Sequence, residues 1–333
     1  MLGRRMIGRR LAFGGENWTM PRMLVGIEIG GTKLQLVLGD GTGAIHDRRR
    51  FAVARDAGGE GIRRQIAATL SPLLERQPVQ AIGVGYGGPV NWRTGQVCCS
   101  HHVEGWSDFP LGGWLRERSG LPVAVDNDAN VAALGEALAG AGRGRSPVLY
   151  VTLGSGVGGG LVVGERIYHG AVPGEVEIGH VRLDRSGATV ESQCSGWAVD
   201  RKVRAAAMAE PGGVLARLTA GMSGGEARQL GAALAAGDAA ARRILEATAQ
   251  DLAFGLSHAV HLLHPELIVL GGGLSLLGEP LRAAVASALP PFLMDAFQPG
   301  PDVMLARLGE DAVPVGALLL AAGEQGGAEV VHR

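Results

Sequence analysis

The chain has 333 residues, of which 46% are hydrophobic and 19% charged, as expected of a soluble globular protein long enough for two domains. The formal net charge of −1 gives no reason to expect a nucleic-acid or membrane partner, and no apolar run approaches the roughly 20 residues that span a bilayer. Three cysteines are too few for a disulfide framework, so we expect a reducing, cytoplasmic location.

Residues 1–22 are basic and rich in glycine, and they contain the pairs Arg4-Arg5 and Arg9-Arg10. A twin-arginine export signal needs an apolar region after the arginines, and none occurs before Glu16. We therefore expect a disordered tail, or a chain whose true start is Met20 or Met23.

The first third of the chain predicts an α/β fold. Apolar runs with β character, one run of helical periodicity and a strand-to-helix junction occur in this order: strands 23–29, 32–38 and 45–53, helix 62–74, strands 79–84 and 121–124, helix 131–138. Gly30-Gly31 joins the first two strands as a hairpin. We expect 90–107 to be an irregular loop whose His101, His102 and Trp106 wall a pocket.

The junction Asp126-Asn127-Asp128-Ala129-Asn130 follows a short strand and opens a helix. Polar side chains at such a position are where α/β proteins expose working groups, and the helix N-terminus attracts anions. The alternative is that Asp126 or Asn127 only caps the helix. We favour a functional site because glycine-rich turns accompany the junction elsewhere in the chain.

The second half repeats the pattern of strand, glycine-rich turn and strand, which suggests two lobes of related topology. The expected elements are strands 147–153 and 160–163, a loop over 168–180, helices 195–208, 238–263 and 281–289, strands 267–270 and 303–308, and a closing helix 313–322. Asp238 is the expected N-cap of the longest helix, whereas 209–237 shows no distinctive chemistry.

Gly154, Gly156 and Gly159 match the dinucleotide fingerprint G-x-G-x-x-G. A dinucleotide site needs a helix after these glycines, but the apolar run after them predicts a strand. A hairpin turn whose backbone N–H groups bind phosphate fits better.

Three glycine turns that follow buried strands, together with an Asn-Asp junction, favour nucleotide-dependent phosphoryl transfer. Phosphate oxygens need converging N–H donors, and glycine lets the backbone approach closely. The transfer also needs Mg²⁺ to neutralise charge and an aspartate to accept the proton of the nucleophile. Asp128 is the candidate base.

These residues resemble the ROK family (repressors, open reading frames and kinases) of the actin-like ATPase superfamily. The resemblance runs from Met23 to the C-terminus, and five motifs occur in the family's order. They are Gly26-Ile27-Glu28-Ile29-Gly30-Gly31-Thr32-Lys33, the turn 85–90, the N-D-x-N of 127–130, the second phosphate motif of 153–159 and Glu177-Ile178-Gly179-His180. The segment 268–274 is similar to the loop on the adenosine side.

The resemblance implies roles for matching residues. Asp128 would take the proton of a sugar hydroxyl. The sugar would be held by Gly88, Asn127, Glu177, His180 and Glu191. The phosphates and nucleotide of ATP would be bound by Gly30, Gly31, Thr32, Lys33, Gly154, Ser155, Gly156, Gly271, Gly272 and Gly273.

Two departures from the family pattern concern metals. Glu28 stands where the family usually has aspartate, although some fructokinase-like members also have glutamate, so an indirect contact with Mg²⁺ would be shifted by one methylene. The family's zinc motif C-x-C-G-x-x-G-C is missing, and Cys194 alone cannot build a tetrahedral site, so we expect no structural zinc. Ordinary packing of Val181, Leu183 and Val190 should hold that loop instead.

The resemblance implies a two-lobed actin-like (ribonuclease H-like) α/β fold and an ATP-dependent hexose kinase, most simply one acting on the 6-hydroxyl of glucose. We expect a small lobe of 23–125 with the helix at 312–324 packing back on it, a large lobe of 126–311, and the site in the cleft between them. A homodimer is expected, with no nucleic-acid or membrane partner.

The alternatives are another sugar (fructose, mannose or an N-acetylhexosamine), a sugar-binding protein without catalysis, and a transcriptional regulator. A regulator needs a DNA-binding domain ahead of the first phosphate motif, and 22 residues there are too few for a three-helix domain.

Overall fold

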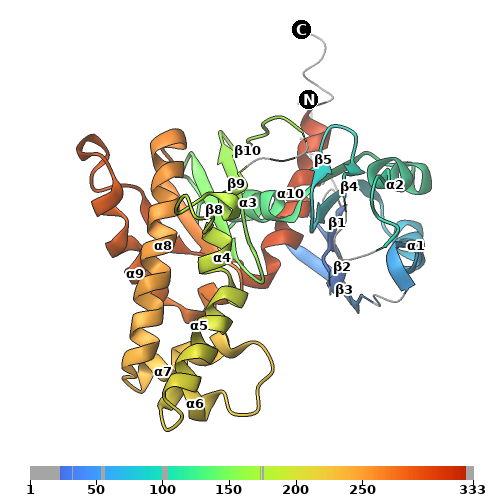
Figure 1. Cartoon of the computed structure of the whole chain (residues 1–333). Helices are drawn as coiled ribbons and strands as arrows, with labels where there is room; N and C mark the ends of the chain where they lie inside the picture. The colour runs from blue at the N-terminus through green and yellow to red at the C-terminus, as the bar shows by residue number, and fades with distance from the viewer. Residues whose placement is uncertain are drawn as a thin grey trace, which may run out of the picture.

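The computed structural model describes residues 23–31, 33–53, 57–99, 104–172, 174 and 176–327. Within these residues the chain forms two lobes, each built on a five-stranded sheet (Figure 1), with strand orders β3-β2-β1-β4-β7 and β10-β9-β8-β11-β12. The strands are β1 Met23–Ile29, β2 Lys33–Gly39, β3 Ile45–Ala52, β4 Val79–Tyr86, β5 Val90–Asn91, β6 Gln96–Val97, β7 Val123–Asn127, β8 Val148–Leu153, β9 Val157–Val163, β10 Arg166–Ile167, β11 Leu267–Gly271 and β12 Asp302–Leu305. Both sheets mix parallel and antiparallel pairs.

Helices flank both sheets. They are α1 Gly58–Arg76, α2 Leu111–Ser119, α3 Asp128–Leu138, α4 Val190–Cys194, α5 Gly196–Ala209, α6 Val214–Leu218, α7 Leu230–Ala235, α8 Ala239–Leu263, α9 Glu279–Ala288 and α10 Ala312–Gly327. Three short 3-10 helices also matter for the site: η2 Ile178–His180, η3 Glu226–Gln229 and η4 Gly273–Leu277. The α/β class expected from the sequence is therefore confirmed.

The small lobe forms around the β1–β2 hairpin. Its apolar residues are nearly all buried because β1 is a central strand, pairing antiparallel with β2 and parallel with β4. Helix α1 covers the sheet through Ile62, Ile66 and Leu70, whose spacing of four residues places them on one face. The helix extends beyond the expected 62–74 at both ends, and α2 was not expected at all, since Gly112-Gly113 weakens its helical pattern.

The large lobe contains the longest helix, α8, which begins as expected. The side chain of Asp238 accepts a hydrogen bond from the N–H of Ala241 at 2.8 Å and so caps the first turn. Strand β9 begins at Val157, earlier than the expected 160, because the glycines after Gly156 continue in extended backbone. A strand therefore follows G-x-G-x-x-G, and the dinucleotide interpretation is excluded.

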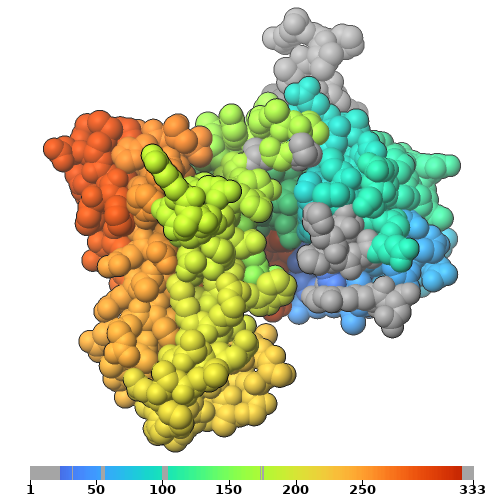
Figure 2. Space-filling model, in the orientation of Figure 1, coloured from blue at the N-terminus to red at the C-terminus, as the bar shows by residue number. Residues whose placement is uncertain are grey.

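Helices α3 and α10 lie in the middle of the molecule, between the two sheets (Figure 1). Helix α10 packs on β1, β4 and α3 at a distance that only glycine permits. A Cβ on Gly83 would overlap the carbonyl of Ala317, and one on Gly316 would overlap the carbonyl of Val131. Figure 2 shows the surface hollowed between the blue-to-cyan small lobe and the yellow-to-orange part of the large lobe. None of the described helices is both long and apolar enough to cross a bilayer.

Candidate active site

Three parallel strands of the small sheet end at one edge. Ile29 of β1 pairs with Tyr86 of β4, which pairs with Asn127 of β7, so the residues that follow them converge. The N–H of Gly87 donates a hydrogen bond to the carbonyl of Ile29 at 2.8 Å, which closes this edge. The sheet therefore brings the first glycine turn, the turn after β4 and the N-D-x-N junction together.

Asp128, the first residue of α3, points into this convergence. A Cβ built on Gly87 would lie 3.3 Å from Oδ2 of Asp128 and 3.5 Å from Cα of Gly30. Burial, followed by the negative charge of Glu28, raises the pKa of Asp128 to about 6, and Glu177 adds a smaller contribution. A carboxyl group with this pKa can accept a proton near neutral pH.

Asn127 caps α3. Its Oδ1 accepts the N–H of Ala129 at 2.8 Å, and its Nδ2 donates to the carbonyl of Gly88 at 3.1 Å. The cap considered for this residue is thus present, and the same side chain connects the junction to the turn after β4. Asn127 and Gly88, both expected at the sugar site, are therefore in contact.

The first glycine turn is closed by a hydrogen bond from the N–H of Gly30 to the carbonyl of Lys33 at 2.8 Å. Glu28 lies beside it, with Oε1 at 3.2 Å from Nζ of Lys33 and Oε2 accepting a hydrogen bond from Gln35. Gln35 is fully buried and also accepts a hydrogen bond from Arg50 at 3.2 Å. Both oxygens of Glu28 are therefore engaged, and Thr32 lies outside the described residues.

The second glycine turn, Gly154-Ser155-Gly156, connects β8 and β9. The N–H of Val157 donates to Oε2 of Glu191 at 2.9 Å, so this carboxylate supports the turn from α4. On the other side, a Cβ on Gly158 would lie 3.4 Å from Cβ of Ala129, in the first turn of α3. The second turn consequently lies directly beside the helix that begins with Asp128.

The third turn, Gly271-Gly272-Gly273, follows β11. Gly272 has φ of +79°, and a Cβ there would meet the backbone of Leu153 at 2.6 Å, so no other residue fits without a shift. Gly271 lies against the ring of Tyr150. The third turn thus packs on the strand that leads into the second.

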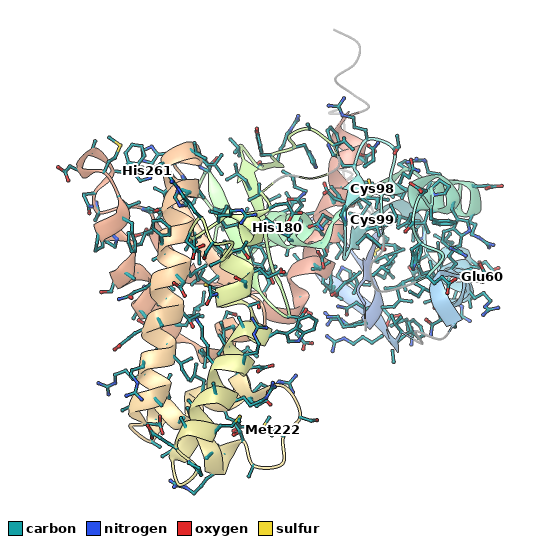
Figure 3. The ribbon with its side chains drawn as sticks, in the orientation of Figure 1. Glu60, Cys98, Cys99, His180, Met222 and His261 are labelled. Carbon is teal, nitrogen blue, oxygen red and sulfur yellow. The ribbon has the colours of Figure 1, made fainter. Side chains whose placement is uncertain are left out.

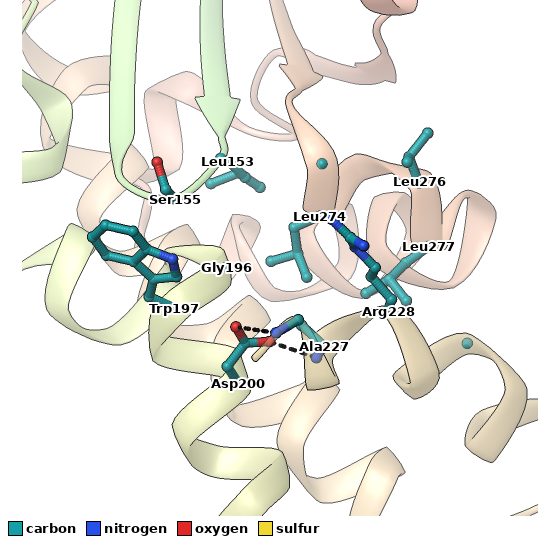
Figure 4. A pocket seen from close by; sticks show the side chains of 14 residues that line it. Leu153, Ser155, Gly196, Trp197, Asp200, Ala227, Arg228, Leu274, Leu276 and Leu277 are labelled. Carbon is teal, nitrogen blue, oxygen red and sulfur yellow. Dashed lines mark hydrogen bonds between the residues drawn. The ribbon is translucent and has the colours of Figure 1, made fainter. Parts of the chain in front are cut away.

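A cavity of about 730 Å³ opens between the second and third turns (Figure 4). Its walls come from β8, α5, η3 and η4 and include Leu153, Gly154, Ser155, Gly196, Trp197, Asp200, Gly225, Ala227, Arg228, Gly231, Gly273, Leu274, Leu276 and Leu277. Both oxygens of Asp200 are hydrogen-bonded, because they accept the N–H groups of Gly225 at 3.1 Å and Ala227 at 2.6 Å. Trp197 is 62% exposed and offers an aromatic face. Glycine turns at one end and a mainly apolar wall are suited to the phosphates and base of a nucleotide.

Glu177 directly precedes η2 and His180 is its last residue, and the two residues between them fix this turn. Ile178 is buried, and a Cβ on Gly179 would overlap the carbonyl of Val157 in β9. Glu177 and His180 remain exposed, and His180 lies near the middle of the molecule in Figure 3. The charge of Glu177 acts on Asp128, so this part of the large lobe faces the base.

The segment after His180 is held by hydrogen bonds and packing. Oδ1 of Asp184 accepts the N–H groups of Gly187 at 2.9 Å and Ala188 at 3.1 Å, and Val190 is fully buried. Cys194 is buried and donates to the carbonyl of Thr248, and burial raises the pKa of its thiol to about 12. The described residues contain no group of three or more His, Cys, Asp or Glu side chains arranged to hold a metal ion.

Sequence reasoning assigned one pocket wall wrongly and missed others. Trp106 is 1% exposed and packs against Tyr86 and Phe109 in the small-lobe core, because the loop folds inward there. His101 and His102 lie outside the described residues. The cavity residues Trp197, Asp200 and Arg228 were not singled out, and only the Gly224-Gly225 pair in 209–237 gave a local signal for a turn.

Proteins of known family and structure match this chain over most of its length. A family model described as the ROK family matches residues 24–324. A glucokinase of Halalkalibacterium halodurans is 32% identical over 315 residues, covering 89% of this chain and 93% of that protein. A glucokinase of Thermotoga maritima is 29% identical over 307 residues, covering 90% and 97%. The crystal structure of a ROK family glucokinase from Streptomyces griseus in complex with glucose and AMPPNP has a TM-score of 0.77 and 31% identity, covering 90% of this chain and 99% of that one.

Proposed function

The chain belongs to the ROK family and is a sugar kinase, and from this premise we propose that it transfers the γ-phosphoryl group of ATP to the 6-hydroxyl of glucose. Asp128 acts as the general base. The observation that carries the proposal is the second glycine turn, which has a nucleotide-sized cavity on one side and the first turn of α3 on the other.

The reaction needs a base that is ionised at neutral pH but still basic enough to take a hydroxyl proton. Asp128, with a pKa raised to about 6, meets both conditions. As the sugar oxygen attacks the γ-phosphorus, its proton passes to Oδ2 of Asp128 and the bond to the leaving ADP oxygen breaks. Because Asp128 begins α3, its position is fixed by the helix and by the Asn127 cap.

Sugar hydroxyls are bound from both lobes in this proposal. Gly88 and Asn127 contribute from the small-lobe edge, whereas Glu177, His180 and Glu191 contribute from the large lobe. Exposed Glu177 and His180 next to a buried anchor are suited to bind hydroxyls, since buried Ile178 and the closely packed Gly179 hold the turn between them.

The nucleotide is bound at the three glycine turns and the cavity. The AMPPNP in the Streptomyces griseus structure supports ATP as the donor. A bound Mg²⁺ would neutralise charge on the transferred phosphoryl group. Glu28 would hold it through water, and it fits this role only if it gives up its contact with Lys33 or Gln35.

The test is a coupled assay of ADP release with a panel of glucose, fructose, mannose, N-acetylglucosamine and N-acetylmannosamine, each with Mg-ATP. Glucose should give the largest kcat/KM, and NMR of the product should show the phosphate on O6. Faster turnover of another sugar would reassign the substrate. No turnover with any of them would refute the kinase proposal.

The base is tested by Asp128→Asn, which keeps the size of the side chain but removes its basicity. We expect kcat to fall by roughly 10²–10⁴-fold while glucose binding measured by calorimetry is retained. Asp295→Asn, at an exposed carboxylate before Phe297, is the matched control and should keep full activity. Activity of Asp128→Asn within threefold of wild type would refute the assignment.

A further inference from the structure

A histidine of the large lobe is bonded to the strand that leads to the base. Nε2 of His169 lies 2.6 Å from Oδ2 of Asp126, although the two residues are 43 positions apart in the chain. His169 follows β10, whereas Asp126 belongs to β7 of the small sheet. This contact therefore joins the lobes beside the N-D-x-N junction.

Asp126 is buried and positioned to accept the hydrogen bond from His169. It is only 3% exposed, and its other oxygen accepts the N–H of Asn127 at 2.7 Å and Nδ2 of Asn130 at 3.0 Å. The carboxylate thus fixes the two asparagines that enclose Asp128 in the sequence, and His169 donates the remaining hydrogen bond. Hydrogen bonds to a buried charge are the stronger kind.

The imidazole is also held by stacking. Trp92, in the β5–β6 turn, lies with its ring centroid 4.1 Å from that of His169, at an interplanar angle of 16°. Arg93 in turn lies over the ring of Trp92, with its Cζ at 4.9 Å from the centroid. Stacking restricts the position of the His169 ring, so that Nε2 stays directed at Asp126.

His169 also precedes the exposed residues Glu177 and His180 in the chain, and the charge of Glu177 acts on Asp128. We propose that His169 is a positioning residue for the sugar site. Its bond to Asp126 sets the distance between Glu177 and Asp128, and thereby increases affinity for the sugar without affecting the nucleotide. This inference rests on the proposed function, because it needs a sugar bound between Glu177 and Asp128.

The experiment compares His169→Ala, His169→Gln and His46→Ala in the full chain. His46 is the matched control, since it makes a histidine–aspartate contact with Asp40 at 2.9 Å on the exposed β2–β3 turn. For His169→Ala we expect KM for the sugar, and its Kd by calorimetry without nucleotide, to rise about tenfold, while KM for ATP stays within twofold. His169→Gln keeps an N–H donor and should recover part of the loss, and His46→Ala should match wild type.

Equal increases in both KM values, or no change in either, would overturn the inference. If His169→Ala does not fold, His169→Gln replaces it in the test. The inference would then be overturned if the KM of His169→Gln for the sugar differed from the wild-type value by no more than its KM for ATP does. Failure of the proposed function is a separate result, because the wild-type protein would then phosphorylate no sugar of the panel.

Discussion

At the scale of single residues, Asp128 shows how position sets chemistry. An aspartate at the start of a helix normally has a lowered pKa, because the N–H groups of the first turn stabilise its charge. Here burial and the neighbouring Glu28 act against those hydrogen bonds, and the pKa of Asp128 rises to about 6. Its position in the sequence predicted a base, but the shift depends on Glu28, which is 100 positions away.

This shift predicts a pH profile. The base works only when ionised, so kcat/KM for the sugar should fall about tenfold per pH unit below pH 6 and level off above it. Initial rates at sugar concentrations well below KM, measured between pH 5 and 8 with saturating Mg-ATP, give this profile. Glu28→Gln removes one of the charges that raise the pKa, and its profile should therefore shift to lower pH. An unchanged profile would contradict the assigned cause.

The backbone conformation of Val176 predicts that one substitution raises the melting temperature and also raises KM for the sugar. It has φ of +53°, a conformation that costs a β-branched residue about 1–2 kcal/mol, and it directly precedes Glu177. Val176→Gly should therefore raise the melting temperature. The same change frees the backbone next to Glu177, so KM for the sugar should rise. Val172→Gly, on the same loop but without a positive φ, is the control; if it stabilised the protein equally, strain at Val176 would not be the cause.

At the scale of elements, the sequence predicted what local patterns determine. The β1–β2 hairpin, the β8–β9 hairpin and the Asp238 cap of α8 each depend on residues close together in the chain, and all three are confirmed. The cavity wall depends on packing between β8, α5, η3 and η4, which no local pattern encodes. The contact between His169 and Asp126 was missed for the same reason.

The third glycine turn gives a prediction with an internal control. A Cβ on Gly272 would meet the backbone of Leu153 at 2.6 Å and would have φ of +79°, whereas a Cβ on Gly273 meets nothing within 4 Å. Gly272→Ala should lower the free energy of unfolding by about 2 kcal/mol or more, because backbone must move. Gly273→Ala should change it by less than about 0.5 kcal/mol. Urea denaturation of the two variants measures this difference, and equal effects would be inconsistent with the close approach.

The loop after His180 gives a prediction about zinc. A thiol with a pKa of about 12 rarely supplies the thiolate that zinc needs, and Asp184 and Val190 already hold the loop. We expect well below one zinc per chain by elemental analysis, and full activity after chelation once Mg²⁺ is restored. Stoichiometric zinc that is lost together with activity would contradict this, and His180 would then be a metal ligand.

At the scale of the whole molecule, the central helices α3 and α10 differ in how they contact the two lobes. Helix α10 packs on β1 and β4 through glycine contacts and therefore belongs mechanically to the small lobe. Helix α3 contacts α10 on one side and β9 on the other, where a Cβ on Gly160 would lie 2.8 Å from Cβ of Ala133. Tight packing on both sides of α3 favours small sliding of the lobes over a free hinge.

We therefore predict a limited closure when substrates bind. Sugar and nucleotide lie between elements of different lobes in the proposed function, so each gains contacts as the lobes approach, and binding should favour the closed form. The radius of gyration measured by X-ray scattering should decrease slightly with glucose and a non-hydrolysable ATP analogue together, and less with either alone. His169→Ala removes one contact between the lobes and should leave the ligand-free protein slightly more open than wild type. A radius that is the same in all these states would show that the lobes are rigid, and that the site is complete before any ligand arrives.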